Sequence, residues 1–195
     1  MRPIAIDATT LSILLNPMAR VPLDPATNGP VELARERLLG FIAQAEKDRR
    51  KLIIPTPATA ELLTAIGPTS ADYIRVVNRK AVFEVRAFDE VAAVELAFLN
   101  RDIFGALDQK NGLEPWQKMK VDRQIIAIAK VANCERILTE DDGLGNRARL
   151  CDIEPLKIID LSIPDSSKQG AFGFEDHEEI PDADPASEES PHGQG

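Results

Sequence analysis

Residues 4–9 read Ile4-Ala5-Ile6-Asp7-Ala8-Thr9, a short apolar run that ends at an aspartate. Comparable apolar runs recur at 52–54, 82–85, 136–139 and 156–159. Between them, apolar residues recur at helical spacing in the ranges 31–50, 58–66, 71–78, 89–100 and 121–132. Because alternating strands and helices favour parallel pairing, the sequence predicts an α/β fold, a three-layer α/β/α domain around a parallel sheet of four to five strands.

Two of the expected helices carry a recognisable start signal. Thr56 followed by Pro57 is typical of an N-cap with proline at the first helical position. Asp89 opens another helix, ahead of apolar residues at helical spacing. The stretches 17–30 and 102–115 lack a regular pattern, and we interpret both as insertions or loops.

The charge divides the chain into a near-neutral body and an acidic tail. The net charge of −9 lies mostly in residues 165–195, which hold nine acids and one base. This tail has too few apolar residues to offset its ordering entropy, so we expect it to be disordered. Residues 1–164 hold 22 bases and 23 acids and are expected to form one domain. The charge of this body neither supports nor excludes a nucleic-acid substrate.

The composition disfavours several other classes of protein. Cys134 and Cys151 cannot form a disulfide framework, and we expect both thiols to be reduced and buried. The two histidines, His177 and His192, are isolated in the tail and are not expected to bind a metal. No apolar run reaches the length of a membrane span, and Asp7 comes too early for a signal peptide. We therefore expect a cytoplasmic protein without membrane contact.

Acids at the expected strand ends are the first candidates for a functional site. Ligands of open parallel sheets collect beyond the carboxyl ends of the strands. Asp7 directly follows the first strand, and Asp141 follows the strand at 136–139 after one residue. Each of them alone could equally be a turn residue or a helix N-cap, which are positions that aspartate favours.

Two further acids lie in the early turns of expected helices. Asp122 falls on the helical arc of Ile125, Ile126 and Ala129, which should face the core. Burying a lone carboxylate costs several kcal/mol, so either this helix start is exposed or a cation meets Asp122. Glu61 lies at the edge of an apolar arc, and alone it could be a solvated boundary residue.

Taken together, the four acids predict a site for a divalent metal ion. Strand ends and early helical turns can converge at one end of a parallel sheet. Two carboxylates about 4 Å apart repel by roughly 4 kcal/mol at an effective dielectric of about 20, so a cluster needs protons or a cation. Oxygen ligands with no Cys or His grouped nearby favour Mg²⁺ or Mn²⁺ over zinc. Phosphodiester hydrolysis is the chemistry that such a site suits.

The segments that carry these acids resemble, in order, the four acidic motifs of PIN domains. They are Ile4-Ala5-Ile6-Asp7-Ala8-Thr9, Ile54-Pro55-Thr56-Pro57-Ala58-Thr59-Ala60-Glu61-Leu62-Leu63, Val121-Asp122-Arg123-Gln124-Ile125-Ile126-Ala127-Ile128-Ala129 and Ile137-Leu138-Thr139-Glu140-Asp141, and the resemblance spans residues 4–161. It implies a metal-dependent endoribonuclease in which Asp7, Glu61, Asp122 and Asp141 bind the metal and act in catalysis. It also implies that Thr9, two places after the first aspartate, assists the site.

The resemblance further implies partners for the chain. They are an RNA substrate, a second copy in a homodimer and, where the protein is a VapC-type toxin, a small antitoxin protein. The sequence departs from the family in three places. Asp142 follows the fourth acid and could share or replace the role of Asp141, the stretch 102–120 is longer than in compact toxins, and the acidic tail is not a family feature.

Basic residues near the third and fourth motifs are candidates for contact with the RNA backbone. They are Lys118, Lys120, Arg123, Arg147 and Arg149, and each could equally be plain surface charge. Trp116 could stack on a base or pack within its loop.

Two alternative functions compete with that of a nuclease. Enzymes that form an aspartyl-phosphate also place an acid after the first strand, but Asp7-Ala8-Thr9 lacks the second aspartate of haloacid dehalogenases and the adjacent acids of receiver domains. A PIN-fold protein that binds RNA or another macromolecule without cutting stays open. Binding of a divalent metal separates this last possibility from a nuclease.

Overall fold

The computed structural model describes residues 1–16, 18–67, 75, 77, 79–105 and 116–164. Within them, five strands form one parallel sheet in the order β3-β2-β1-β4-β5. The strands are β1 (Ile4–Ile6), β2 (Leu52–Pro55), β3 (Phe83–Arg86), β4 (Arg136–Leu138) and β5 (Glu154–Leu156). The helices are α1 (Ala8–Leu15), α2 (Ala34–Lys47), α3 (Thr56–Ile66), α5 (Glu90–Leu99), the π-helix η2 (Asn100–Phe104), α7 (Trp116–Val131), α8 (Asp142–Arg149) and the 3-10 helix η3 (Ile158–Asp160).

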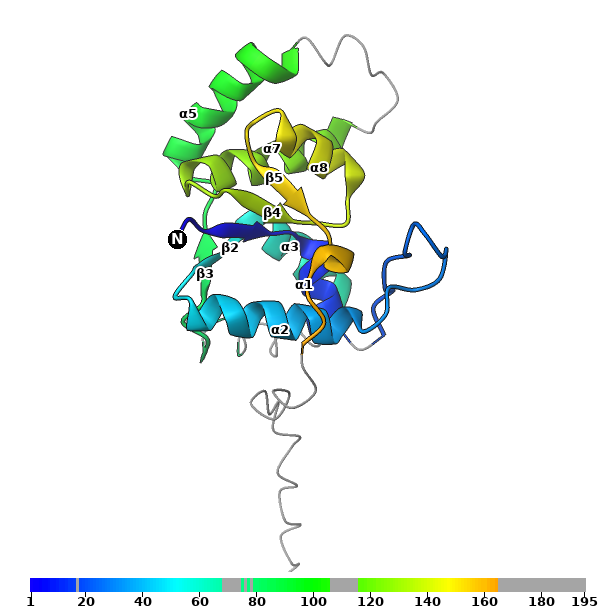
Figure 1. Cartoon of the computed structure of the whole chain (residues 1–195). Helices are drawn as coiled ribbons and strands as arrows, with labels where there is room; N and C mark the ends of the chain where they lie inside the picture. The colour runs from blue at the N-terminus through cyan, green and yellow to red at the C-terminus, as the bar shows by residue number, and fades with distance from the viewer. Residues whose placement is uncertain (17, 68–74, 76, 78, 106–115, 165–195) are drawn as a thin grey trace, which may run out of the picture.

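Helices cover both faces of the sheet, which confirms the predicted α/β fold. Figure 1 shows α2 below the sheet and α7, α8 and α5 above it. Successive residues of β1 point to opposite faces, so Ile4 and Ile6 join the core with α1 and α2, while Ala5 joins the core with α7 and α8. All three residues are buried, as expected for a central parallel strand covered on both sides.

Helices α1 and α8 are absent from the sequence prediction. In α1, Thr10, Leu11, Ile13 and Leu14 are all buried, so the segment lacks the polar face by which a surface helix is recognised. The sequence of α8 holds two glycines within its first four residues, which lowers its helix propensity. Both helices form because each has an aspartate N-cap and packs against the sheet.

The strand predicted at 156–159 is wrong in its position. Strand β5 lies two residues earlier, and the backbone N–H groups that follow it are bound locally. The N–H of Ile158 donates to the Glu140 carboxylate at 2.7 Å, and that of Lys157 donates to Asp160 at 3.0 Å. These bonds turn the chain into η3 and end the pairing with β4.

The predicted helix starts have mixed outcomes. Asp89 is the N-cap of α5, as predicted, and its side chain accepts a hydrogen bond from the N–H of Ala92. The N-cap of α3 is Pro55 and not Thr56, whose hydroxyl instead accepts from the N–H of Phe88 at 3.1 Å. Helix α7 begins at Trp116, five residues before the predicted start.

Several other predictions fall on residues outside the described ranges. The predicted helix at 71–78 lies largely outside these ranges. Residues 106–115 of the predicted loop at 102–115 and the acidic tail at 165–195 lie wholly outside them. Residues 102–104, predicted as part of a loop, belong instead to η2. Residues 23 and 30 of the other predicted loop pair in an isolated antiparallel bridge.

Cys134 and Cys151 are free and buried, as predicted. Burial raises the pKa of the Cys134 thiol to about 12 and that of Cys151 to about 11. Neither thiol is therefore a reactive group at neutral pH.

None of the helices in the described ranges has the length and apolar character needed to cross a membrane.

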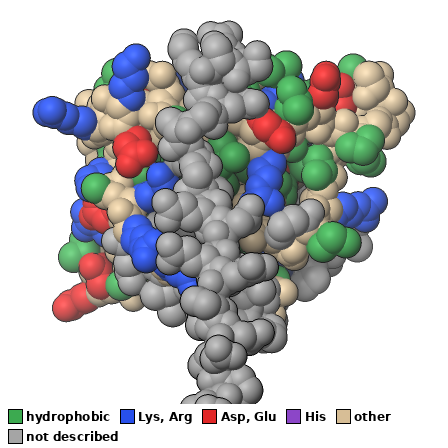
Figure 2. Space-filling view, turned by 90° about the horizontal axis from the view of Figure 1, so that it is seen from below, with side chains coloured by type: hydrophobic (Ala, Val, Ile, Leu, Met, Phe, Trp, Pro, Cys, Tyr) green, Lys and Arg blue, Asp and Glu red, His purple; other side chains and the backbone are tan. Residues whose placement is uncertain are grey.

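The face on the α2 side bears no single dominant charge. Seen from below, the described part of this face shows basic, acidic and apolar side chains interspersed (Figure 2). This pattern matches the near-neutral charge of residues 1–164.

Asp89→Ala should lower the free energy of unfolding by about 1 kcal/mol, because the first turn of α5 loses its side-chain cap. Asp89→Ser keeps an oxygen acceptor and is the matched control, so it should cost much less. Chemical denaturation of both variants measures the difference, and equal losses would contradict the capping role.

Candidate functional site

The topology brings the four predicted acids to the carboxyl edge of the sheet. Asp7 follows β1 directly, and Asp141 follows β4 as the N-cap of α8. Helix α3 begins immediately after β2 and carries Glu61 in its second turn. Helix α7 returns from this edge toward the start of β4, so Asp122, in its second turn, lies at the same edge.

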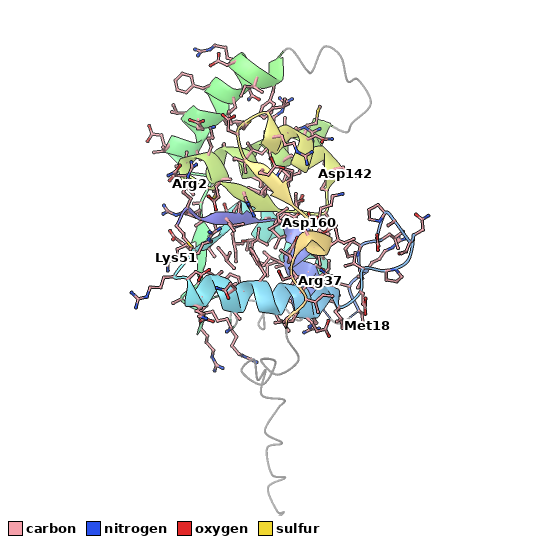
Figure 3. The ribbon with its side chains drawn as sticks, viewed as in Figure 1. Arg2, Met18, Arg37, Lys51, Asp142 and Asp160 are labelled. Carbon is pink, nitrogen blue, oxygen red and sulfur yellow. The ribbon has the colours of Figure 1, made fainter. Side chains whose placement is uncertain are left out.

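The labelled side chains of Figure 3 mark the two edges of the sheet. Arg2 and Lys51, which precede β1 and β2, lie at one end of the molecule, and Asp142 and Asp160 lie at the other. The second end is therefore the carboxyl edge, and it contains the start of α8.

Asp7 is the most deeply buried of the four acids, with 4% of its surface exposed. One carboxylate oxygen accepts from the N–H of Thr10 at 2.9 Å, and the other accepts from the hydroxyl of Thr139 at 2.5 Å. Burial raises the pKa of Asp7, and these hydrogen bonds oppose the shift. The side chain is therefore fixed by hydrogen bonds, but no positive charge fully compensates its carboxylate.

Asp141 is bound both to its own helix and to a lysine. Its side chain accepts from the N–H of Leu144 at 3.1 Å and forms an ion pair of 2.7 Å with Lys118. Burial alone would raise the pKa of Asp141, but the Lys118 ammonium and the helix N–H groups lower it overall. The backbone N–H of Asp141 donates to the Thr139 hydroxyl at 3.1 Å, so Thr139 links Asp141 to Asp7.

Asp122 pairs with an arginine in a nearly closed environment. Its Oδ2 atom lies 2.8 Å from Nη1 of Arg147, and 8% and 13% of the two side chains are exposed. Burial and the charges of Asp141, Glu61 and Asp7 raise the pKa of Asp122 to about 7. The positive charge of Lys118 opposes this shift.

Glu61 completes the group from the solvent side. Glu61 as a whole is exposed, but its carboxyl group is partly buried. This burial and the charges of Asp7 and Asp141 raise the pKa of Glu61. Asp7, Glu61 and Asp141 each raise the pKa of Asp122, and Asp141 also raises the pKa of Asp7 and Glu61. The structure brings Asp7, Glu61, Asp122 and Asp141 into one electrostatic cluster, called the acid cluster below.

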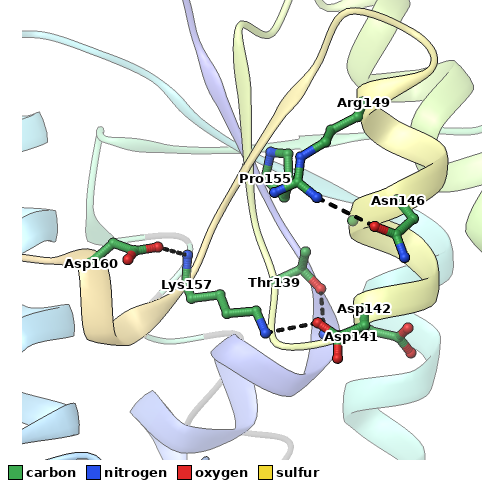
Figure 4. Close-up of a pocket in the computed structure, with 9 residues that line it drawn as sticks. Thr139, Asp141, Asp142, Asn146, Arg149, Pro155, Lys157 and Asp160 are labelled. Carbon is green, nitrogen blue, oxygen red and sulfur yellow. Dashed lines mark hydrogen bonds and ion pairs between the residues drawn. The ribbon is translucent and has the colours of Figure 1, made fainter. Parts of the chain in front are cut away.

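Asp142 lies outside the acid cluster. Its carboxylate is largely exposed and forms an ion pair of 2.7 Å with Lys157. Figure 4 shows it beside a cavity lined by Thr139, Asp141, Asp142, Gly145, Asn146, Arg149, Pro155, Lys157 and Asp160. The geometry therefore favours Asp141 over Asp142 as the fourth acid.

The threonine and basic residues singled out from the sequence lie in varied positions. Thr9 is exposed, whereas the neighbouring Thr10 is buried and contacts Asp7. Lys118, Lys120 and Arg149 are exposed. Arg149 lies 3.5 Å from Glu154, and the side chain of Trp116 is outside the described residues.

Arg123 is not the surface residue that was expected. It is 6% exposed, its guanidinium lies 4.9 Å from the ring centre of Phe104, and it donates to the side chain of Asn100 at 3.0 Å. Arg123 therefore joins α7 to η2, and its burial argues against contact with RNA.

Sequence reasoning missed Thr139 and the pairing of Lys118 and Arg147 with the acids. A hydroxyl residue at the end of a strand, ahead of two acids, is the one local signal for Thr139. The ion pairs join residues 23 and 25 positions apart, and a linear sequence does not reveal which acid each base meets.

The donor chemistry of the acid cluster fits a hard divalent cation. Its side chains offer carboxylate oxygens, the ligands that Mg²⁺ and Mn²⁺ prefer. As they stand, no three acidic, histidine or cysteine side chains in the described part of the chain are grouped closely enough to hold an ion. Lys118 and Arg147 supply the positive charge instead.

The comparisons with known proteins support the fold. No family model matches this chain, and no curated protein matches it. Among solved structures, the chain resembles one in the crystal structure of VapBC2 from Rickettsia felis bound to a DNA fragment from their promoter. The TM-score is 0.52 at 13% identity, over 79% of this chain and 97% of that chain. The likeness shows a shared fold and agrees with the PIN-like architecture that the motifs imply.

Thr139→Val should lower the free energy of unfolding by about 1–3 kcal/mol at neutral pH, because a buried carboxylate loses a hydrogen bond. Thr139→Ser keeps the hydroxyl and should stay close to the wild type. Denaturant unfolding of both variants tests this, and a valine variant as stable as the serine variant would remove Thr139 from its linking role.

Stability should fall with rising pH through Asp122. Its pKa rises from 3.8 to about 7 on folding, so the folded state keeps a proton that the unfolded chain has lost. The resulting stability is present below about pH 4 and is lost as the pH rises through about 7. In EDTA, the wild type should lose stability over this range that Asp122→Asn keeps. Parallel pH profiles of the two proteins would contradict the shift.

Proposed function

We propose that this chain is a Mg²⁺- or Mn²⁺-dependent endoribonuclease with a PIN-like fold. The observation that carries the proposal is the acid cluster itself. Four acidic side chains from four separate segments lie at the carboxyl edge of a parallel sheet, where ligands of such sheets bind, and three of them raise the pKa of the fourth, Asp122. Asp7 and Asp122 are buried there, at a cost that capping and packing do not require. A cation-dependent function accounts for this cost.

In this proposal Asp7, Glu61, Asp122 and Asp141 hold the ion. When bound, the ion supplies Lewis-acid chemistry that activates water and neutralises charge on a phosphate. Thr139 orients Asp7 by donating its hydroxyl hydrogen, and the N–H of Asp141 donates to the same hydroxyl oxygen. Glu61, on the solvent side, faces the approaching substrate. Thr9 stays a proposed auxiliary residue because of the family resemblance.

The exposed bases beside the acid cluster are proposed to contact the RNA backbone. Lys118, Lys120 and Arg149 have accessible side chains, so they can approach phosphates. Arg147 is nearly closed from solvent in its ion pair with Asp122, so it would reach RNA only after release.

A toxin role with a protein partner is a further part of the proposal. The similar solved structure is a VapBC2 complex bound to promoter DNA, and the motifs resemble those of VapC-type toxins. We therefore propose a small antitoxin as partner, together with a homodimer of this chain. Co-purification with the product of the adjacent reading frame tests the first, and sedimentation tests the second.

One observation favours a second function, a PIN-fold protein that binds RNA without cutting. Asp122 and Asp141 are already paired with Arg147 and Lys118, and the described acids form no ready metal site. Metal binding separates the two functions. A nuclease should gain thermal stability from millimolar Mn²⁺, and a non-catalytic protein should not.

The purified protein should cleave RNA only with Mg²⁺ or Mn²⁺, and Asp7→Asn or Asp122→Asn should reduce cleavage by about 100-fold or more. Asn keeps the shape of both side chains and, at residue 7, the cap of α1, so the fold should persist. Asp142→Asn is the matched control, because Asp142 pairs with Lys157 outside the cluster, and it should cleave like the wild type. Cleavage that persists in EDTA, or unchanged cleavage by Asp122→Asn, would contradict the proposed site.

A further inference from the structure

We infer that Arg147 is an internal counter-ion of Asp122 which a divalent ion must displace, so that Arg147 sets the metal affinity of the acid cluster. This inference rests on the proposed metal-dependent function and concerns how that site is regulated. It assigns Arg147 as a positioning residue and not as a catalytic one.

The contact between the two side chains is direct and shielded. Nη1 of Arg147 donates to Oδ2 of Asp122 at 2.8 Å, and both side chains are nearly buried. A guanidinium that donates to a carboxylate oxygen occupies the place where a metal ion would bind that oxygen. A divalent ion and Arg147 therefore compete for Asp122.

The second internal cation is a weaker competitor. Lys118 lies 2.7 Å from Asp141, but 48% of its side chain and 26% of that of Asp141 are exposed. Exposed ion pairs are screened by water and contribute little, whereas breaking a buried pair leaves uncompensated charge. Release of Arg147 should therefore be the costlier step.

Helix α8 couples the two acids. Its N-cap is Asp141, and its second turn carries Arg147, which reaches across to Asp122 on α7. Helices α7 and α8 pack against each other in the same core. An ion that binds Asp122 and Asp141 together would therefore use a ligand at the start of α8, the same helix that carries the competing Arg147.

Arg149 offers a matched control on the same helix. It lies two residues after Arg147, so it points to a different side of α8, where it meets Asn146 and Glu154. Replacing either arginine removes one positive charge from α8. Only the replacement of Arg147 removes the contact with Asp122.

Mn²⁺ binding without RNA tests the inference directly. Isothermal titration calorimetry would compare the wild type, Arg147→Met and Arg149→Met at one pH and ionic strength. Arg147→Met should bind Mn²⁺ about tenfold or more tightly than the wild type, and Arg149→Met should stay within about twofold, because long-range charge effects are screened by salt. Equal or weaker binding by a folded Arg147→Met protein would overturn the inference.

A second measurement uses the wild type alone and does not depend on the folding of the variant. The guanidinium Nε–H signal of Arg147 in NMR, assigned with Arg147→Lys, should shift or broaden as diamagnetic Mg²⁺ is added, while that of Arg149 should stay in place. Saturation with Mg²⁺ without a change at Arg147 would refute displacement. A wild type that binds neither ion would contradict the proposed metal-dependent function itself, whereas binding without any Arg147 effect would contradict only the counter-ion role.

Discussion

Repulsion among four carboxylates at one edge of the sheet is the constraint on which the rest of this structure depends. A parallel sheet places all its carboxyl ends together, and here Asp7 and Asp141 follow two neighbouring strands of that sheet. Helices α3 and α7 add Glu61 and Asp122 to the same edge. Burial makes each negative charge more costly, because little water remains to screen it.

The chain meets this cost in three ways. The N-terminus of α1 and the Thr139 hydroxyl donate hydrogen bonds to Asp7, and the N-terminus of α8 and Lys118 stabilise Asp141. Arg147 compensates Asp122. Glu61 stays partly in water. These devices leave the pKa of Asp7, Glu61 and Asp122 raised, so the compensation is incomplete and further positive charge would be stabilising.

Much of the fold follows from the sequence because apolar runs and helical spacing act locally. Four of the five strands lie within one or two residues of their predicted positions. Strand β5 ends earlier than predicted, because the side chains of Glu140 and Asp160 accept hydrogen bonds from the backbone N–H groups that follow it. The sequence does not predict helix α1, because Thr10, Leu11, Ile13 and Leu14 are buried and little of a polar face is left.

The acid cluster could be predicted in part, and the reason is again the range of the interactions. Position after a strand or within a helical turn is a local property, which is why the four acids could be selected. The roles of the bases depend on contacts across the fold. Arg123 and Arg147 look alike in the sequence, but one is buried on Phe104 and the other on Asp122. Only the packing of α7 against η2 and α8 distinguishes them.

The identity of residue 7 shows where the demands of the fold end and those of a site begin. An N-cap needs a side-chain oxygen, and asparagine serves about as well as aspartate in that position. Asparagine would accept the Thr10 N–H through its one carbonyl oxygen, and its amide N–H would face Thr139 as a donor, without a buried negative charge. Because burial raises the pKa of Asp7, the charge itself opposes the folded state near neutral pH. Capping therefore does not account for a carboxylate at this position, and a function that uses its charge does.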